Sequence, residues 1–212
     1  MKGLCKSNLK LLALILLAFV QPTNASETPL EPRAIMQFSS TLHESSALAS
    51  RGKNLWTLND SGNGALIFKL DNIGNELNSF RMANTINSDW ESLASDAHFL
   101  YIGDIGNNFN RRRKLTIYRI AWEDIENPEP SAQRITFIYA DHKSGLPMSH
   151  DFDAEAIAIH GNEIWLFTKN RGDRNSNLYR FPKLPGHYRP KTTQVLPVNS
   201  LVTAADIHPK TR

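Results

Sequence analysis

Cysteine is almost absent from this sequence, because Cys5 is the only one among its 212 residues. A framework of intramolecular disulfides is therefore excluded. Long apolar runs are scarce as well: the longest, residues 11–20, is far short of the roughly 20 residues that a membrane-spanning helix needs. A glycine-rich phosphate loop, a Gly-x-Ser-x-Gly elbow and a His-Glu-x-x-His pair are also missing. The sequence thus carries none of these signatures of nucleotide-binding, serine hydrolase or zinc protease sites.

The first 25 residues have the three parts of a secretory signal. Three basic residues come first, the apolar run follows, and the segment ends in small residues: Lys2, Lys6 and Lys10, then 11–20, then 23–25. We predict cleavage after Ala25, a linker over 26–33 and a folded domain over 34–212; an uncleaved membrane anchor is the alternative. Cys5 precedes the apolar run, whereas a lipid-carrying cysteine would follow it. The expected product is a periplasmic or secreted bacterial protein with no membrane span in the mature chain.

The excess of positive charge belongs to that segment. The whole chain has 24 Lys+Arg and 21 Asp+Glu, and the first 25 residues contain three lysines and no acid. Subtracting them leaves 21 basic and 21 acidic residues in the mature chain. A neutral chain is not expected to bind nucleic acid. The basic run Arg111–Lys114 is accordingly interpreted as a solvated hairpin.

Similar segments recur along the rest of the chain. Four short runs of small and apolar residues begin at 44, 91, 155 and 203, with spacings of 47, 64 and 48 residues. After each of the first three come two segments that contain aromatic residues and one that is more polar. The predicted strands are 44–50, 55–58, 66–70 and 77–82; 91–95, 100–103, 115–119 and 135–139; 155–160, 164–167, 177–181 and 194–198; and 203–208.

Four short strands per unit predict an all-β fold, specifically a β-propeller of four-stranded blades. Three blades and one inner strand, 203–208, are fewer than the roughly four to eight blades that close a ring. We therefore expect a truncated chain, or a ring completed by another chain. Residues 34–39 are expected to form an outer strand that would close the ring. A β-sandwich is the alternative.

Acidic residues gather at the starts of the predicted inner strands. The pairs Asp89/Glu91 and Asp153/Glu155 should each place both carboxylates on one side of an extended strand, at the mouth of the channel. Such carboxylates repel one another unless a cation lies among them, and oxygen ligands favour calcium over zinc. The metal candidates are Glu44, Asp89, Glu91, Asp104, Asp153 and Glu155, with Asn59, Asp151 and Asp206 as further channel-mouth candidates. Capping of backbone amides, ion pairing with arginine and metal-free catalysis are the alternatives.

A turn of the form Asx-x-Gly-Asx recurs at 60–63, 104–107 and 170–173. A turn role accounts for it, because Asx side chains bond nearby amides and glycine adopts positive φ. The loop 140–153 is the longest that enters a blade and is the expected place for ligand specificity. His43, His150 and His160 lie beside the acidic strand starts, as candidate bases or as core or turn residues.

Four motifs together resemble an uncharacterised family of exported bacterial β-propeller proteins. They are 58–63 (LNDSGN), 89–91 (DWE), 101–108 (YIGDIGNN) and 152–156 (FDAEA). More distantly, the pattern is similar to the six-bladed calcium-dependent phosphotriesterase and lactonase superfamily. That resemblance implies a calcium ion held at the channel mouth by acid and amide side chains, with Glu44, Glu91, Asp104 and Glu155 in matching places.

The sequence therefore supports two hypotheses of function. The first is a binding or scaffold module with a structural calcium ion and an unidentified small-molecule or protein partner. The second is a calcium-dependent hydrolase of esters, lactones or phosphoesters.

Overall fold

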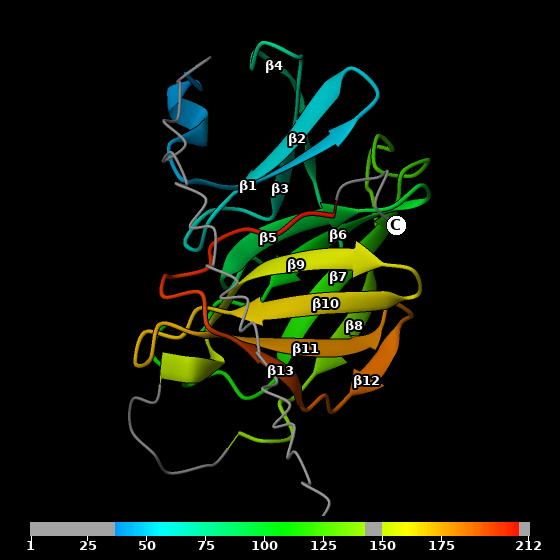
Figure 1. Cartoon of the computed structure of the whole chain (residues 1–212). Helices are drawn as coiled ribbons and strands as arrows, with labels where there is room; N and C mark the ends of the chain where they lie inside the picture. The colour runs from blue at the N-terminus through cyan, green and yellow to red at the C-terminus, as the bar shows by residue number, and fades with distance from the viewer. Residues whose placement is uncertain (1–36, 143–149, 208–212) are drawn as a thin grey trace, which may run out of the picture. The chain divides into compact units, whose positions relative to one another are not determined.

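The computed structural model describes residues 37–142 and 150–207, and in this part the chain is all-β (Figure 1). The described residues contain two short 3-10 helices, η1 (Ser40–Leu42) and η2 (His150–Phe152), and no α-helix. The strands are β1 (Ser45–Arg51), β2 (Asn54–Asn59), β3 (Leu66–Leu70), β4 (Glu76–Arg81), β5 (Trp90–Ser95), β6 (Phe99–Asp104), β7 (Leu115–Ala121), β8 (Gln133–Phe137), β9 (Ala154–His160), β10 (Glu163–Thr168), β11 (Ser176–Pro182), β12 (Gly186–Tyr188) and β13 (Thr192–Leu196). The predicted all-β class is confirmed.

These strands form three sheets, each an antiparallel meander. Their orders are β1-β2-β3-β4, β5-β6-β7-β8 and β9-β10-β11-β13, with β12 added in parallel to the outer side of β8. Two-residue loops that begin with glycine close the first hairpins of the first and third sheets. Gly52 and Gly161 adopt φ of 61° and 57° there, the left-handed backbone that such hairpin turns require.

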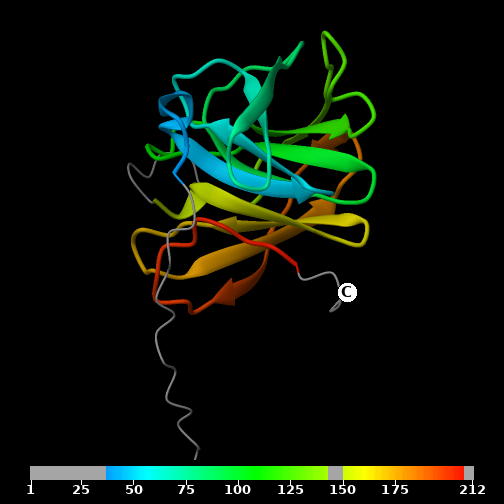
Figure 2. The same ribbon diagram turned by 90° about the horizontal axis from the view of Figure 1, so that it is seen from above.

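The sheets lie as successive layers (Figure 2). Between the first two, Trp56 and Leu58 pack with Trp90 and Trp122 in one buried cluster. Between the second and third, a separate cluster gathers aromatic and branched side chains around Tyr139. Burial of each large apolar side chain contributes about 1.5–3 kcal/mol, so these two layers hold the sheets together.

The first strands of the three sheets lie next to one another. Ser46 Oγ donates to the carbonyl of Trp90 at 3.0 Å, and the amide of Ile157 donates to Ser92 Oγ at 3.1 Å. Ala49 on β1 and Ala94 on β5 are buried, and their small side chains allow these strands to pack closely. The ends of β1, β5 and β9 are thereby brought together, which positions the acidic residues discussed below.

Two predicted strands differ from the structure, and the structure contains one strand that the sequence did not predict. Residues 203–208 were expected to form a strand, but 203–207 are irregular, because none of their backbone groups pairs with a neighbouring strand in the described part. The expected outer strand 34–39 is likewise wrong for 37–39, which lead irregularly into η1, while 34–36 lie outside the described residues. Strand β12 was not predicted. The predicted signal segment 1–25, the linker 26–33 and half of the predicted ligand loop, residues 143–149, lie outside the described residues.

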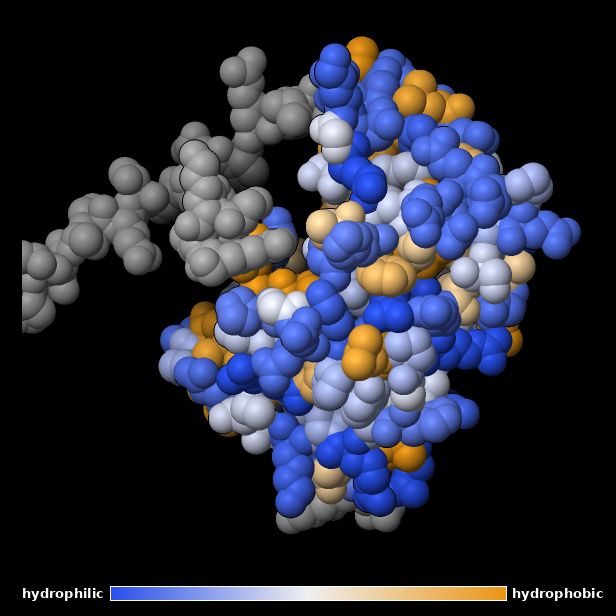
Figure 3. All heavy atoms as spheres, turned by 90° about the vertical axis from the view of Figure 1, so that its right-hand side faces the viewer, coloured by the Kyte–Doolittle hydropathy of each residue, from blue (hydrophilic) through white to orange (hydrophobic). Residues whose placement is uncertain are grey.

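The surface on one side is mainly hydrophilic, with several separate hydrophobic patches (Figure 3). Exposed large apolar side chains occur singly on turns and edges, such as Ile73, Leu77 and Phe109. Within the described residues, no helix has the length and apolar character needed to cross a membrane.

Candidate functional site

Each sheet has an irregularity in register at the start of its first strand. In the pairing of β1 with β2 it skips Ser46, in β5 with β6 it skips Glu91, and in β9 with β10 it skips Glu155. An extra residue at such a place forms a β-bulge, which re-aims a side chain and is common beside functional sites. Glu91 and Glu155 therefore occupy equivalent bulges in two neighbouring sheets.

The backbone also fixes which acids correspond from sheet to sheet. The carbonyls of Glu44, Asp89 and Asp153 accept hydrogen bonds from the amides of Asp60, Ile105 and Lys169. Glu44 is thus the counterpart of Asp89 and Asp153. The recurring segments of the sequence match Glu44 with Glu91 and Glu155. In the structure Glu44 corresponds instead to Asp89 and Asp153, two residues earlier in the chain.

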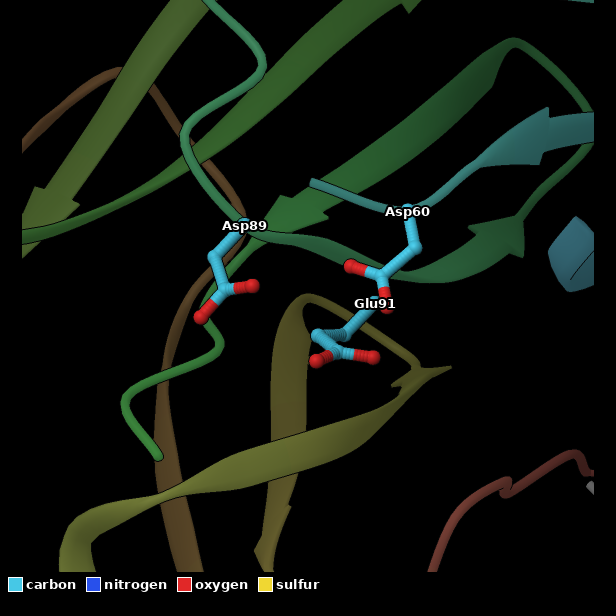
Figure 4. A group of neighbouring side chains, drawn as sticks. All are labelled: Asp60, Asp89 and Glu91. Atoms are coloured by element: carbon cyan, nitrogen blue, oxygen red, sulfur yellow. The ribbon is translucent and has the colours of Figure 1, made fainter. Parts of the chain in front are cut away.

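Three carboxylates meet where the first two sheets adjoin (Figure 4). Asp60 follows β2, Asp89 precedes β5 and Glu91 lies on β5. One carboxylate oxygen from each lies within 4.8 Å of the other two. The cluster brings together two predicted metal candidates and Asp60, which the sequence analysis had assigned only to a turn.

Two neighbouring features hold this cluster in place. Asn87 Nδ2 donates to the carbonyls of Asn59 and Asp60 at 3.0 and 2.9 Å, so the turn after β2 is tied to the segment before β5. Gly106 lies against the acids, because a Cβ at that position would be 2.4 Å from Asp89 Cγ and 2.9 Å from Glu91 Cγ. Glycine is required there for close approach.

The electrostatics of the cluster are unfavourable without a cation. Glu91 is only 8% exposed, and in the described part of the chain its carboxylate has no hydrogen bond or ion pair. Burial, followed by repulsion from Glu155, Asp60 and other acids, raises the pKa of Glu91 to about 9. Burial and repulsion from Asp60 also raise the pKa of Asp89, which Arg112 opposes. Glu91 therefore keeps its proton at neutral pH unless a positive charge replaces it.

Three of the other four metal candidates are each paired with a basic side chain. Asp104 accepts from Arg112 Nη2 at 2.7 Å, and from the amide of Asp89 at 2.9 Å. Asp153 forms an ion pair with Arg171, and Glu155 one with Lys169. Each of these three carboxylates thus has the counter-ion that Glu91 lacks in the described residues. The arginine-pairing alternative thus describes the contacts of Asp104 and Asp153, which also accept from backbone amides, while the close partner of Glu155 is a lysine.

The remaining candidates are not among the three clustered acids. Glu44 is exposed and accepts from Asn63 Nδ2 at 2.5 Å. The side chain of Asn59 is buried and donates to the carbonyl of Thr41 at 2.8 Å, and Asp151 is half-buried on η2. Asp206 is exposed and borders a cavity of about 470 Å³ beside β1 and β5.

The candidate bases occupy other places. His43 is exposed and bonds the carbonyl of Ser40, and the ring of His160 stacks on Trp165 at the end of β9. The side chain of His150 lies outside the described residues.

The chemistry of the cluster suits a hard divalent cation. Three carboxylates offer up to six oxygens, which calcium accepts in flexible geometry, and neither sulfur nor imidazole is among them. A divalent cation that displaced the proton of Glu91 would face up to three negative charges, one from each carboxylate of the cluster. The donor set therefore fits the calcium expected from the sequence, with Asp60 in addition to Asp89 and Glu91.

The chain was also compared with known proteins. No protein-family model matches it, and a search of curated proteins finds no match either.

Proposed function

We propose that the three sheets are blades of a β-propeller and that the protein is an exported binding or scaffold module with a calcium ion at the channel mouth. The repeated strand order, the adjacent first strands and the three bulges at equivalent positions support the propeller. The expected ligand is an unidentified small molecule or protein. The secretory signal predicted over residues 1–25 supports export.

One observation carries the calcium proposal: the buried carboxyl of Glu91 faces two other acids and has no basic partner in the described residues. A buried charge is costly unless it is paired or binds a metal. The neighbouring Asp104, Asp153 and Glu155 each have such a partner. A cation at Asp60, Asp89 and Glu91 would complete the same compensation.

Calcium titration of the wild-type protein and of Glu91→Gln tests this proposal. In chelator, Glu91→Gln should melt at a higher temperature than the wild type, because it removes a repelled acid. Calcium should raise the melting temperature of the wild type and leave that of Glu91→Gln unchanged. Glu123→Gln, at an exposed acid outside the cluster, is the matched control and should respond like the wild type. An unchanged wild-type melting temperature at millimolar calcium would refute the site.

A calcium-dependent hydrolase of esters, lactones or phosphoesters is the second candidate. The observation that favours it is the cluster of Asp60, Asp89 and Glu91, since a cation bound by these carboxylates would polarise a carbonyl or phosphoryl oxygen of a substrate. Turnover of an aryl ester, a lactone and a phosphotriester separates the two functions. Turnover that depends on calcium and falls in Glu91→Gln favours the hydrolase, and calcium binding without turnover favours the binding module.

A further inference from the structure

The loop between β6 and β7 is fastened at both of its ends. We call residues 107–114 the Phe109 loop. The side chain of Asn107 donates to the carbonyl of Arg112 at 3.0 Å and accepts from its amide at 2.8 Å. Arg112 in turn donates to the carbonyl of Gly106 at 2.7 Å and to the side chain of Asp104. These bonds fix the tip of the loop without using the side chains of Phe109 and Arg111.

The tip presents one aromatic ring among basic groups. Phe109 is 70% exposed, and the guanidinium of Arg111 lies 5.4 Å from the centre of its ring. Arg113 and Lys114 are exposed as well. The loop contains no acid, and of its four consecutive basic residues Arg112 forms the ion pair to Asp104. The expectation of a solvated hairpin thus holds for three of the four, while Arg112 turns inward.

We propose that the Phe109 loop binds the surface of an anionic phospholipid bilayer. A ring that protrudes at a tip offers no enclosed pocket for a small anion and no series of rings for successive bases. A bilayer accepts such a ring between its headgroups, while phosphates contact the surrounding cations. This surface contact is independent of the calcium site, although it would bring the segment at Gly106, which lies against Asp89, close to the lipid.

A fluorescent probe at the tip tests the proposal in the full chain. Phe109→Cys, in a Cys5→Ser background, is labelled with an environment-sensitive dye and mixed with vesicles of equal phosphatidylglycerol and phosphatidylcholine. We expect a blue shift and a brighter signal with these vesicles and neither with pure phosphatidylcholine. Adding Arg111→Gln, Arg113→Gln and Lys114→Gln should raise the lipid concentration at half-maximal signal by about 100-fold, or roughly fivefold for each cation.

The control places the same dye at Ile73, which is 64% exposed in the turn between β3 and β4. That label should stay in water with every vesicle, even if the apolar residues 11–20 attach the chain to lipid. No shift at position 109, or an equal shift at position 73, would overturn the proposal. So would an equal response at 109 to single-stranded DNA or to a sulfated polysaccharide, which would assign the loop to soluble polyanions.

Discussion

Replacing Glu91 with glutamine should stabilise the protein at neutral pH in the absence of calcium. Glutamine keeps the size of the side chain and removes its titration. The pKa of Glu91 is about 9 in the folded protein, against an ordinary value of 4.5. Between these two pH values the unfolded chain has released a proton that the folded chain retains. Stability therefore falls as the pH rises.

The size of the effect follows from the same two values. The contribution of Glu91 is fully present below pH 4.5 and is lost progressively up to pH 9, at about 1.4 kcal/mol per pH unit. At pH 7 the loss amounts to about 3 kcal/mol. The free energy of unfolding of the wild type should thus decrease more steeply with pH than that of Glu91→Gln.

Urea unfolding followed by tryptophan fluorescence, in chelator at pH 5 to 9, measures both slopes. Calcium should remove most of the difference by supplying the missing positive charge to the wild type. Glu123→Gln should reproduce the wild-type slope, since this residue is exposed. Equal slopes for the wild type and Glu91→Gln in chelator would show that the carboxyl is not held in its protonated form, and the reasoning would fail.

Three further predictions concern the surroundings of the cluster and the core. Gly106→Ala should lower the free energy of unfolding by about 1–3 kcal/mol and abolish the calcium-induced rise in melting temperature, because its Cβ would lie 2.4 Å from Asp89. The control is Gly172→Ala, in the turn after the second strand of the third sheet. Its Cβ makes only an ordinary contact at 3.5 Å, so this variant should melt like the wild type. Partial burial raises the pKa of Asp96, but Lys183 and two backbone amides outweigh it and lower the pKa to about 2. Because solvent screens this partly exposed group, Asp96→Asn should cost about 1 kcal/mol at pH 7 in urea unfolding, and this cost should disappear as the pH falls from about 4 to 2. Tyr139→Phe should leave the free energy of unfolding unchanged or raise it by up to about 1 kcal/mol, since the buried hydroxyl of Tyr139 has no hydrogen-bond partner in the described residues. Tyr179→Phe loses a hydrogen bond to Asp141 and should unfold at a lower urea concentration than the wild type.

The repeated strands could be predicted from the sequence because their signal is local. In each sheet, apolar and aromatic residues are concentrated in runs of five to seven residues between turns, which is enough to indicate a strand. Residues 203–208 have the same local pattern as β9, yet 203–207 form no strand, since a strand also needs a neighbour to accept its hydrogen bonds. Strand β12 is the opposite case: its three residues have no distinctive pattern and pair with β8, about 50 residues away.

The acidic site could be predicted only in part for a related reason. Asp89 and Glu91 are two residues apart, so their proximity follows from strand geometry, even though the bulge modifies it. Asp60 joins them from another sheet, through a turn and a layer contact that the linear sequence does not display. The only sequence signal for Asp60 was its position at the start of the recurring Asx-x-Gly-Asx turn. That position is explained equally well by a role in the turn alone.

Corresponding positions in the three sheets explain why one acid lacks a partner while its counterpart has one. The residue whose amide binds the carbonyl at the strand entrance is Asp60 in the first sheet, Ile105 in the second and Lys169 in the third. In the third sheet this lysine pairs with the bulged Glu155. In the second sheet Ile105 is fully buried in the apolar core, so it gives the bulged Glu91 no charge, and the nearest corresponding side chain is the acidic Asp60 of the first sheet. The same backbone hydrogen bond at the strand entrance therefore places a lysine beside Glu155 in the third sheet and no basic residue beside Glu91 in the second. A cation would stabilise the second sheet most at this point, because three acids meet there.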